Sequence, residues 1–160
     1  MAITKARWMA VLIWLFAPIA YAASPQTQVW TFGTIVVEQG WARLEPDQSN
    51  AAKIYLTIHN KSNNDDYLLA VESQAAKLAM IHQANQQPVP GGLTMPSHSE
   101  VVMRPDNYHI MVNELSQSIR PGSNLPIRIV LRDAGSFDLS VPVLEAGESD
   151  PPVTHRGHGS

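Results

Sequence analysis

The chain has 160 residues, a formal net charge of −3 and 44% hydrophobic residues, which suits one folded domain with one core. It contains no cysteine, which excludes disulfide bonds, zinc ribbons, iron–sulfur clusters and blue-copper centres that need a thiolate ligand. The charge is close to neutral and no basic run follows the first residues, so nothing indicates nucleic-acid binding.

Residues 1–22 have the features of a secretory signal peptide. Lys5 and Arg7 make a short positive region, an apolar run follows over residues 8–20, and Ala20-Tyr21-Ala22 is a small-x-small cleavage pattern. The apolar run is shorter than the roughly 20 residues that a membrane span needs. We therefore expect residues 1–22 to be removed and the mature protein to be periplasmic, with no stable membrane span after cleavage.

Short strands dominate the pattern from residue 28 onward. β-branched and aromatic residues alternate or run together in eight segments. These segments are residues 34–37, 54–60, 67–71, 77–84, 100–103, 108–114, 125–131 and 137–144. Turn residues separate them, and no segment keeps a helical period for three turns. The spacing predicts an all-β sandwich or barrel of seven to nine short strands over residues 23–145.

The C-terminal residues 146–160 contain Gly, Pro and polar residues with no apolar periodicity. This composition predicts a disordered tail, which carries His155 and His158. One alternative is that these two histidines and His98 together buffer Cu(II) or another dication. The other is that the tail histidines have no role.

The chain carries no motif of a known catalytic site. A nucleophile elbow, a phosphate-binding glycine loop and a carboxylate pair beside a histidine are all missing from the sequence. We therefore expect a protein that is not an enzyme.

Two short segments combine histidine with methionine. Met80 and His82 are two residues apart within one predicted strand, and His109 and Met111 are two residues apart within another. Residues two apart on a strand point to the same face, so each strand offers an imidazole beside a thioether. If the two strands converge, two histidines and two methionines can meet.

Such a set of ligands favours copper. Thioether sulfur is soft and binds Cu(I) well, and imidazole binds either oxidation state, so we expect Cu(I), with Cu(II) as a further candidate. Both ligands stay usable in an oxidising compartment, where paired cysteines would form a disulfide. Spacing alone equally allows a structural interpretation, in which the methionines fill the core and each histidine makes a hydrogen bond.

The segment Pro105-Asp106-Asn107-Tyr108-His109-Ile110-Met111 resembles the Pro-Gly-Gly-x-His-x-Met motif of PCuAC-type periplasmic copper chaperones (the DUF461-like family). Gly40-Trp41-Ala42-Arg43, residues 52–60, residues 66–69 and Arg120-Pro121-Gly122 also agree with that family. The similarity covers about residues 28–145. Asp and Asn replace the two turn glycines, and both tolerate the left-handed backbone of such a turn.

The resemblance implies a cupredoxin-like or immunoglobulin-like β-sandwich and a metal site. Its ligands in the family are a His, a Met about a dozen residues later, and a His-x-Met segment about two dozen residues after that. Carried over, the pattern gives His82, Met95, His109 and Met111. Met80, on the face of His82, and His98 are the alternatives for the fourth ligand.

The resemblance also implies a function. The protein would be a monomeric copper chaperone that delivers Cu(I) to a periplasmic partner, for cytochrome oxidase copper-site assembly. An exposed site at the end of the sandwich would suit such transfer. The alternative is a degenerate family member that binds no metal and serves as a β-sandwich interaction or assembly module.

Overall fold

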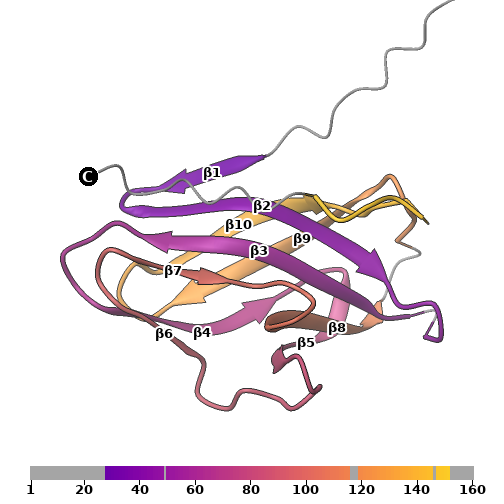
Figure 1. Ribbon diagram of the computed structural model, residues 1–160, viewed down its shortest axis with the longest axis horizontal. Coiled ribbons are helices and arrows are strands. Elements are labelled where there is room, and N and C mark those ends of the chain that lie inside the picture. Colours follow the sequence, from indigo (N-terminus) through magenta and orange to yellow (C-terminus); the bar gives the residue numbers. More distant parts are fainter. Residues whose placement is uncertain (1–27, 49, 116–118, 146, 152–160) are drawn as a thin grey trace, which may run out of the picture.

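The structure is a computed structural model that describes residues 28–48, 50–115, 119–145 and 147–151. These residues form ten strands and no helix (Figure 1). The first five are β1 (Val29–Phe32), β2 (Ile35–Leu44), β3 (Ala52–Asn60), β4 (Asp66–Glu72) and β5 (Ala76–Gln83). The others are β6 (Leu93–Met95), β7 (Ser99–Val102), β8 (Tyr108–Leu115), β9 (Asn124–Leu131) and β10 (Ser136–Pro142).

The strands make two antiparallel sheets. A six-stranded sheet has the order β1-β2-β3-β8-β5, with β7 also paired to β3. A four-stranded sheet has the order β10-β9-β4-β6. Figure 1 shows β9 and β10 behind β2 and β3, so the two sheets lie face to face as a sandwich.

The core lies between the sheets because the strands alternate in polarity. In β9, Leu125, Ile127 and Ile129 are buried while the residues between them are more exposed. In β3, Ile54 and Ile58 face the same core from the other sheet, within one cluster of buried apolar side chains. This alternation is the two-residue period of a strand with one buried face.

A shift in the register of β2 determines which of its side chains lies on the outer face of the six-stranded sheet. The register between β2 and β3 shifts between Glu38 and Trp41, and Gln39 has a φ of 57°. A Cβ on Gly40 would lie 2.9 Å from the Val141 side chain, so the shifted backbone needs glycine there. Because of this extra residue, Trp41 rather than Gly40 lies opposite Tyr55.

The all-β sandwich predicted from the sequence is confirmed. The structure adds two strands to the eight predicted segments, β1 and β6, which are four and three residues long. The proposed signal peptide, residues 1–22, and the tail residues His155 and His158 lie outside the described residues. Within those residues, no helix is long and apolar enough to cross a membrane.

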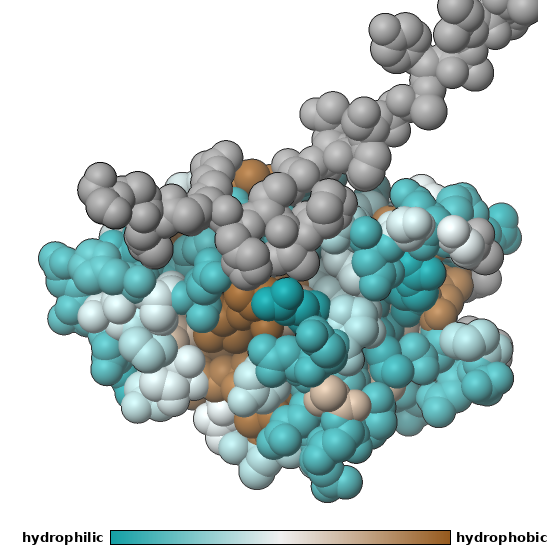
Figure 2. Space-filling view, viewed as in Figure 1, coloured by the Kyte–Doolittle hydropathy of each residue, from teal (hydrophilic) through white to brown (hydrophobic). Residues whose placement is uncertain are grey.

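Seen from the side of β3 and β7, the surface is mostly hydrophilic, with a stripe of hydrophobic residues left of its centre and smaller hydrophobic areas at its right and upper edges (Figure 2). A second, small apolar cluster of Trp41, Tyr55 and Leu144 is separate from the main core. Trp41 and Tyr55 come from β2 and β3, and they lie on the opposite face of the six-stranded sheet from Ile54. The outer face of this sheet therefore carries buried side chains of its own.

Candidate metal centre

Strands β5 and β8 bring both predicted histidine–methionine pairs together. The two strands are antiparallel neighbours, and their register places Met80 opposite Met111 and His82 opposite His109. Residues directly opposite each other in an antiparallel pair share a face, with Cβ atoms about 4.5–5.5 Å apart. The four side chains therefore form a two-by-two array of imidazoles and thioethers on one face.

This array lies on the outer face of the six-stranded sheet. The alternate residues Ile81, Ile110 and Val112 point the other way and belong to the main core. Figure 1 shows β5 and β8 next to each other at the lower edge of the molecule, and β5 is an edge strand of the six-stranded sheet, so the array lies at the border of that sheet.

The array is largely buried rather than exposed. His109 is 1% exposed and Met111 8%, whereas Met80 is 37% exposed and His82 is intermediate. Neighbouring side chains on the outer face account for this burial. Lys53 lies opposite Met111 on β3, and the Tyr55 ring centroid is 6.2 Å from that of His109. The expectation of an exposed site is therefore wrong for His109 and Met111, which are buried, whereas Met80 is exposed.

The two imidazoles are arranged edge to face. Their ring centroids are 5.7 Å apart and their planes are inclined by 73°. Two imidazoles that bind one metal ion at about 2 Å place their ring centres roughly 5 to 6 Å apart. Nδ1 of His82 and Nε2 of His109 are buried and make no hydrogen bond with the rest of the described chain. Each such atom costs about 1–3 kcal/mol, so the pair is a site that a ligand can stabilise.

Both histidines are held neutral near pH 7. Burial lowers the pKa of His82 and of His109 below the ordinary value of 6.5, and the positive charge of Lys53 lowers both further. His82 also lowers the pKa of His109, whereas Glu45 raises it. A neutral imidazole keeps the lone pair with which it binds a metal, so less proton competition opposes binding at this site.

Aromatic side chains border the histidines on β2 and β3. The rings of Trp41 and Tyr55 lie 4.3 Å apart at an angle of 34°. Burial, with the negative charge of Glu45, raises the pKa of Tyr55 to about 12, so its hydroxyl stays protonated. Tyr55 is thus an uncharged aromatic neighbour of His109. Trp41 packs against Tyr55, so metal binding at His109 can be followed by a change in Trp41 fluorescence.

The structure does not bring Met95 or His98 to this array. Met95, on β6, belongs to the four-stranded sheet, is 1% exposed within the core, and its carbonyl accepts a hydrogen bond from Asn60. His98 has a φ of 54° and its Nε2 lies 2.9 Å from Oδ1 of Asn63. Asn60 ends β3, five residues beyond Tyr55, which places Met95 about 16 Å along the strand from the level of His109.

Sequence reasoning did not single out Lys53 and Tyr55 as neighbours of the site. Both come from β3, which is far from His82 and His109 in the sequence. Their alternation along β3 does indicate that they share a face, but only the register between β3 and β8 shows which residues they meet.

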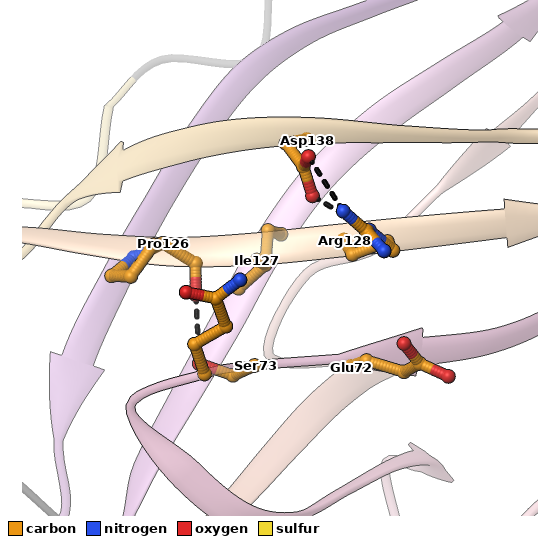
Figure 3. Close-up of a pocket in the computed structure, with 7 residues that line it drawn as sticks. Glu72, Ser73, Pro126, Ile127, Arg128 and Asp138 are labelled. Atoms are coloured by element: carbon orange, nitrogen blue, oxygen red, sulfur yellow. Dashed lines mark hydrogen bonds and ion pairs between the residues drawn. The ribbon is translucent and has the colours of Figure 1, made fainter.

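Two other features of the described residues do not suggest a second site. No group of three histidine, aspartate or glutamate side chains there could hold a metal ion. A groove of about 460 Å³ between β4 and β9 is lined by Ser73, Arg128 and Asp138 among others (Figure 3). Arg128 donates two hydrogen bonds of 2.8 Å to Asp138, and the Ser73 hydroxyl donates to the Pro126 carbonyl, so these polar groups are already paired.

Comparison with solved structures establishes the fold. The copper-bound PCuAC domain from PmoF2 is 22% identical, with a TM-score of 0.65 over 73% of this chain and 97% of that domain. The apo form of the PmoF2 domain gives a TM-score of 0.68 at 21% identity, over 78% and 100% of the two chains. The Cu(I) form of DR1885 from Deinococcus radiodurans gives 0.59 at 20% identity, over 82% and 89%.

Comparison at the level of sequence establishes the family. No curated protein matches the chain. The family model named LpqE-like, whose description is of a lipoprotein, matches residues 35–143, which include β2 to β10. The match spans both sheets and the whole histidine–methionine array. This protein therefore belongs to the LpqE-like family and has the cupredoxin-like sandwich of the PCuAC domains.

Proposed function

We propose that this protein binds one Cu(I) ion on the outer face of β5 and β8 and passes it to another protein. The observation that carries the proposal is the array itself: two cross-strand pairs, His82 with His109 and Met80 with Met111, in which two buried imidazole nitrogens have no partner in the described chain. This donor set fits a soft monovalent ion, because thioether sulfur adds little to the binding of hard dications.

The ligands in this proposal are Nδ1 of His82, Nε2 of His109 and the sulfur atoms of Met111 and Met80. Three of them are the residues predicted from the sequence, and the fourth is Met80 in place of Met95. The register supports Met80, since it lies opposite Met111 on the same face. Met95 is packed in the core of the other sheet, and its side chain would have to leave that core to reach the array.

The different exposure of the four ligands suggests a route for metal transfer. His109 and Met111 are buried and would hold the ion until late in the exchange, whereas Met80 is 37% exposed on an edge strand. A thiolate, thioether or imidazole of a partner can approach the ion from the side of Met80 and replace its sulfur first. The process is ligand exchange: each metal–ligand bond to this chain is replaced by one to the partner, and no covalent bond within either protein changes, so the process requires no enzyme activity.

The site of action in this proposal is the periplasm, where the chain would arrive through its signal peptide. The receiving partner would be a protein of cytochrome oxidase copper-site assembly. Support comes from the signal-peptide pattern of residues 1–22, from the lipoprotein description of the family, and from the copper-bound state of the similar PCuAC domains. The chain itself has no cysteine to which a lipid could be attached by a thioether.

The test is an anaerobic titration of the mature chain with Cu(I) against a competing colorimetric chelator, followed by X-ray absorption at the copper edge. We expect one equivalent of Cu(I) with two nitrogen and two sulfur neighbours. The variant His98→Ala is the matched control, since His98 faces Asn63 in a distant loop, and it should bind like the wild type. A wild-type chain that takes up no Cu(I) would favour the non-metal interaction module instead.

A further inference from the structure

Lys53 is the charged side chain that lies closest to the array in the register of the sheet. It is directly opposite Met111 on β3, which continues the row of Met111 and Met80 by one more strand. Its side chain is 20% exposed, and its Nζ lies 3.1 Å from Oε2 of Glu45. The ammonium group is therefore held at the border of the site by an ion pair rather than extended freely into solvent.

The charges around the two histidines are unequal in their effect. Lys53 lowers the pKa of both His82 and His109, whereas Glu45 raises the pKa of His109 alone. Lys53 lies in the row of the array itself, whereas Glu45 follows the end of β2, so Glu45 offsets the positive charge only in part. The next cation along the same row, Arg43, is paired with Asp150 at 2.8 Å.

A lysine is an unusual neighbour for a site that binds a cation. The apolar stem of a lysine can cover a neighbour such as Met111, but a methionine could do the same without bringing a charge. The ammonium group repels any metal ion in the array, and this repulsion grows in proportion to the charge of the ion. A divalent ion is therefore disfavoured more than a monovalent one.

We infer that Lys53 biases the site toward the monovalent state of copper: its charge, moderated by Glu45, disfavours Cu(II) and other dications at imidazoles that would otherwise accept them. The inference rests on the proposed function, because it concerns the selectivity of the same site. Imidazole binds both copper states and zinc, so two histidines alone would not discriminate among these ions. The soft methionines favour Cu(I), and Lys53 acts against its competitors.

The size of the effect follows from the difference of one unit of charge between the two copper ions. For charges several Å apart at the border of a protein, this difference corresponds to roughly a tenfold change in the ratio of Cu(I) to Cu(II) affinity. A tenfold change in that ratio shifts the reduction potential of the bound copper by 59 mV. The potential is thus a direct readout of the selectivity.

The experiment measures Cu(I) affinity by competition, and the reduction potential of bound copper, in the mature wild-type chain and in the variants Lys53→Met, Lys53→Arg and Glu45→Gln. Lys53→Met keeps a long apolar stem without the charge, and Lys53→Arg keeps the charge. Glu45→Gln leaves Lys53 unneutralised. His109→Ala provides the blank for Cu(II) bound at other histidines.

We expect Lys53→Met to lower the potential by about 59 mV, which is a tenfold gain of Cu(II) over Cu(I). Lys53→Arg should match the wild type, and Glu45→Gln should shift the potential in the opposite direction. The inference is overturned if the ratio of affinities in Lys53→Met stays within twofold of the wild type, or if Lys53→Arg changes it as much. If Lys53→Met does not fold, the absence of an upward shift in Glu45→Gln overturns it equally.

The outcomes separate the two proposals. A wild-type chain that binds no Cu(I) contradicts the proposed function itself. A wild-type chain that binds Cu(I) with an unchanged ratio in Lys53→Met and Glu45→Gln leaves the copper site intact and removes only the role of Lys53.

Discussion

His59 and the pair formed by His82 and His109 all lie on the six-stranded sheet, and their surroundings are opposite in kind. Nε2 of His59 lies 3.0 Å from Oε1 of Glu38, and its Nδ1 lies 3.3 Å from Oε2 of Glu100. Both ring nitrogens of His59 thus face carboxylates, on β2 and β7, and the side chain links three strands. In the pair, by contrast, one buried nitrogen of each ring makes no hydrogen bond with the described chain.

This difference shows how one sheet uses the same residue type for two purposes. A histidine whose nitrogens are both occupied by neighbouring carboxylates stabilises the packing of its strands. A buried histidine with an unoccupied nitrogen costs stability unless a ligand binds there. His82 and His109, which have such an unoccupied nitrogen, also lie beside Met80 and Met111. Buried nitrogens without a hydrogen-bond partner in the described chain and soft sulfur donors therefore occur together on β5 and β8.

Replacing the histidines one at a time should give the largest contrast. His109→Ala should weaken Cu(I) binding by more than about 100-fold, beyond the 10–100-fold that loss of an outer-shell partner of a metal site costs. His59→Ala should leave Cu(I) affinity unchanged but lower the free energy of unfolding by about 1–3 kcal/mol, because Glu38 is then buried without its imidazole. Competitive Cu(I) titration and urea unfolding of both variants give the two quantities.

His82→Ala provides a second test in case His109→Ala does not fold. His82 is less buried than His109, so His82→Ala should fold even if His109→Ala does not. Its Cu(I) affinity should also fall by more than about 100-fold, beyond the range for loss of an outer-shell partner. Equal Cu(I) affinity in the His59 and His82 variants would contradict the distinction between the two environments.

Among the methionines we expect a smaller difference in Cu(I) affinity, between Met80 and Met111 in the array and Met95 in the core. Met111→Leu and Met80→Leu remove a sulfur and keep nearly the same volume, so each should weaken Cu(I) binding by roughly tenfold while the free energy of unfolding changes by less than about 1.5 kcal/mol. Met95→Leu makes the same exchange in the core and should leave Cu(I) affinity unaltered. The same titrations measure all three, and a loss confined to Met95→Leu would restore Met95 as the fourth ligand.

Lowering the pH should reduce the free energy of unfolding of the metal-free protein, because burial holds His82 and His109 neutral. The pKa of His82 and of His109 is lowered in the folded chain, chiefly by burial, so the unfolded chain binds more protons once the pH falls below about 6.5. Folding stability should therefore be fully present above about pH 6.5 and decline as the pH falls toward the folded pKa values. Urea unfolding at a series of pH values from about 7.5 to 5 measures the decline in the metal-free protein.

The matched variant for this pH dependence is His82→Ala, in which one of the two groups is removed and the decline should be shallower. Asp66 does not interfere in this range. Burial acts to raise its pKa, but three backbone N–H donors lower it below 3.8 overall, so Asp66 affects stability only at lower pH. If the free energy of unfolding declines with pH equally steeply in His82→Ala and in the wild type, the decline is not due to the pair of His82 and His109.

Particular residues show how far the sequence alone could predict this site. The strand of His109 and Met111 was predicted because β-branched residues and the two-residue spacing act locally. Met95 was predicted as the fourth ligand from its spacing to His82, with Met80 as the alternative, because both spacings are compatible with a ligand. The pairing of β5 with β8, which no local pattern gives, favours Met80. The same holds for Lys53: its contact with the site depends on the register of β3, a property of distant segments. β6 was not predicted because its three residues carry too little periodicity.

The smallest effect is expected from the tail. Arg43 donates hydrogen bonds to the carbonyl of Glu148 and to Asp150, and these contacts hold the last described residues against β2. The side chains of Arg43 and Asp150 are 34% and 48% exposed, so their ion pair contributes at most about 1 kcal/mol. A chain that ends after Pro151 keeps these contacts and lacks His155 and His158. It should match the full chain in melting temperature and in Cu(I) stoichiometry.

A chain that ends after Glu145 is the comparison for this truncation, since it also loses both contacts of Arg43. Its free energy of unfolding should fall by no more than about 1 kcal/mol, while one equivalent of Cu(I) still binds, because all four proposed ligands lie on β5 and β8. Thermal unfolding and Cu(I) titration of the two truncated chains separate the tail histidines from the Arg43 contacts. If the chain ending after Pro151 loses its Cu(I), His155 or His158 is a ligand, and the contrast between partnered and unpartnered histidines no longer identifies the site.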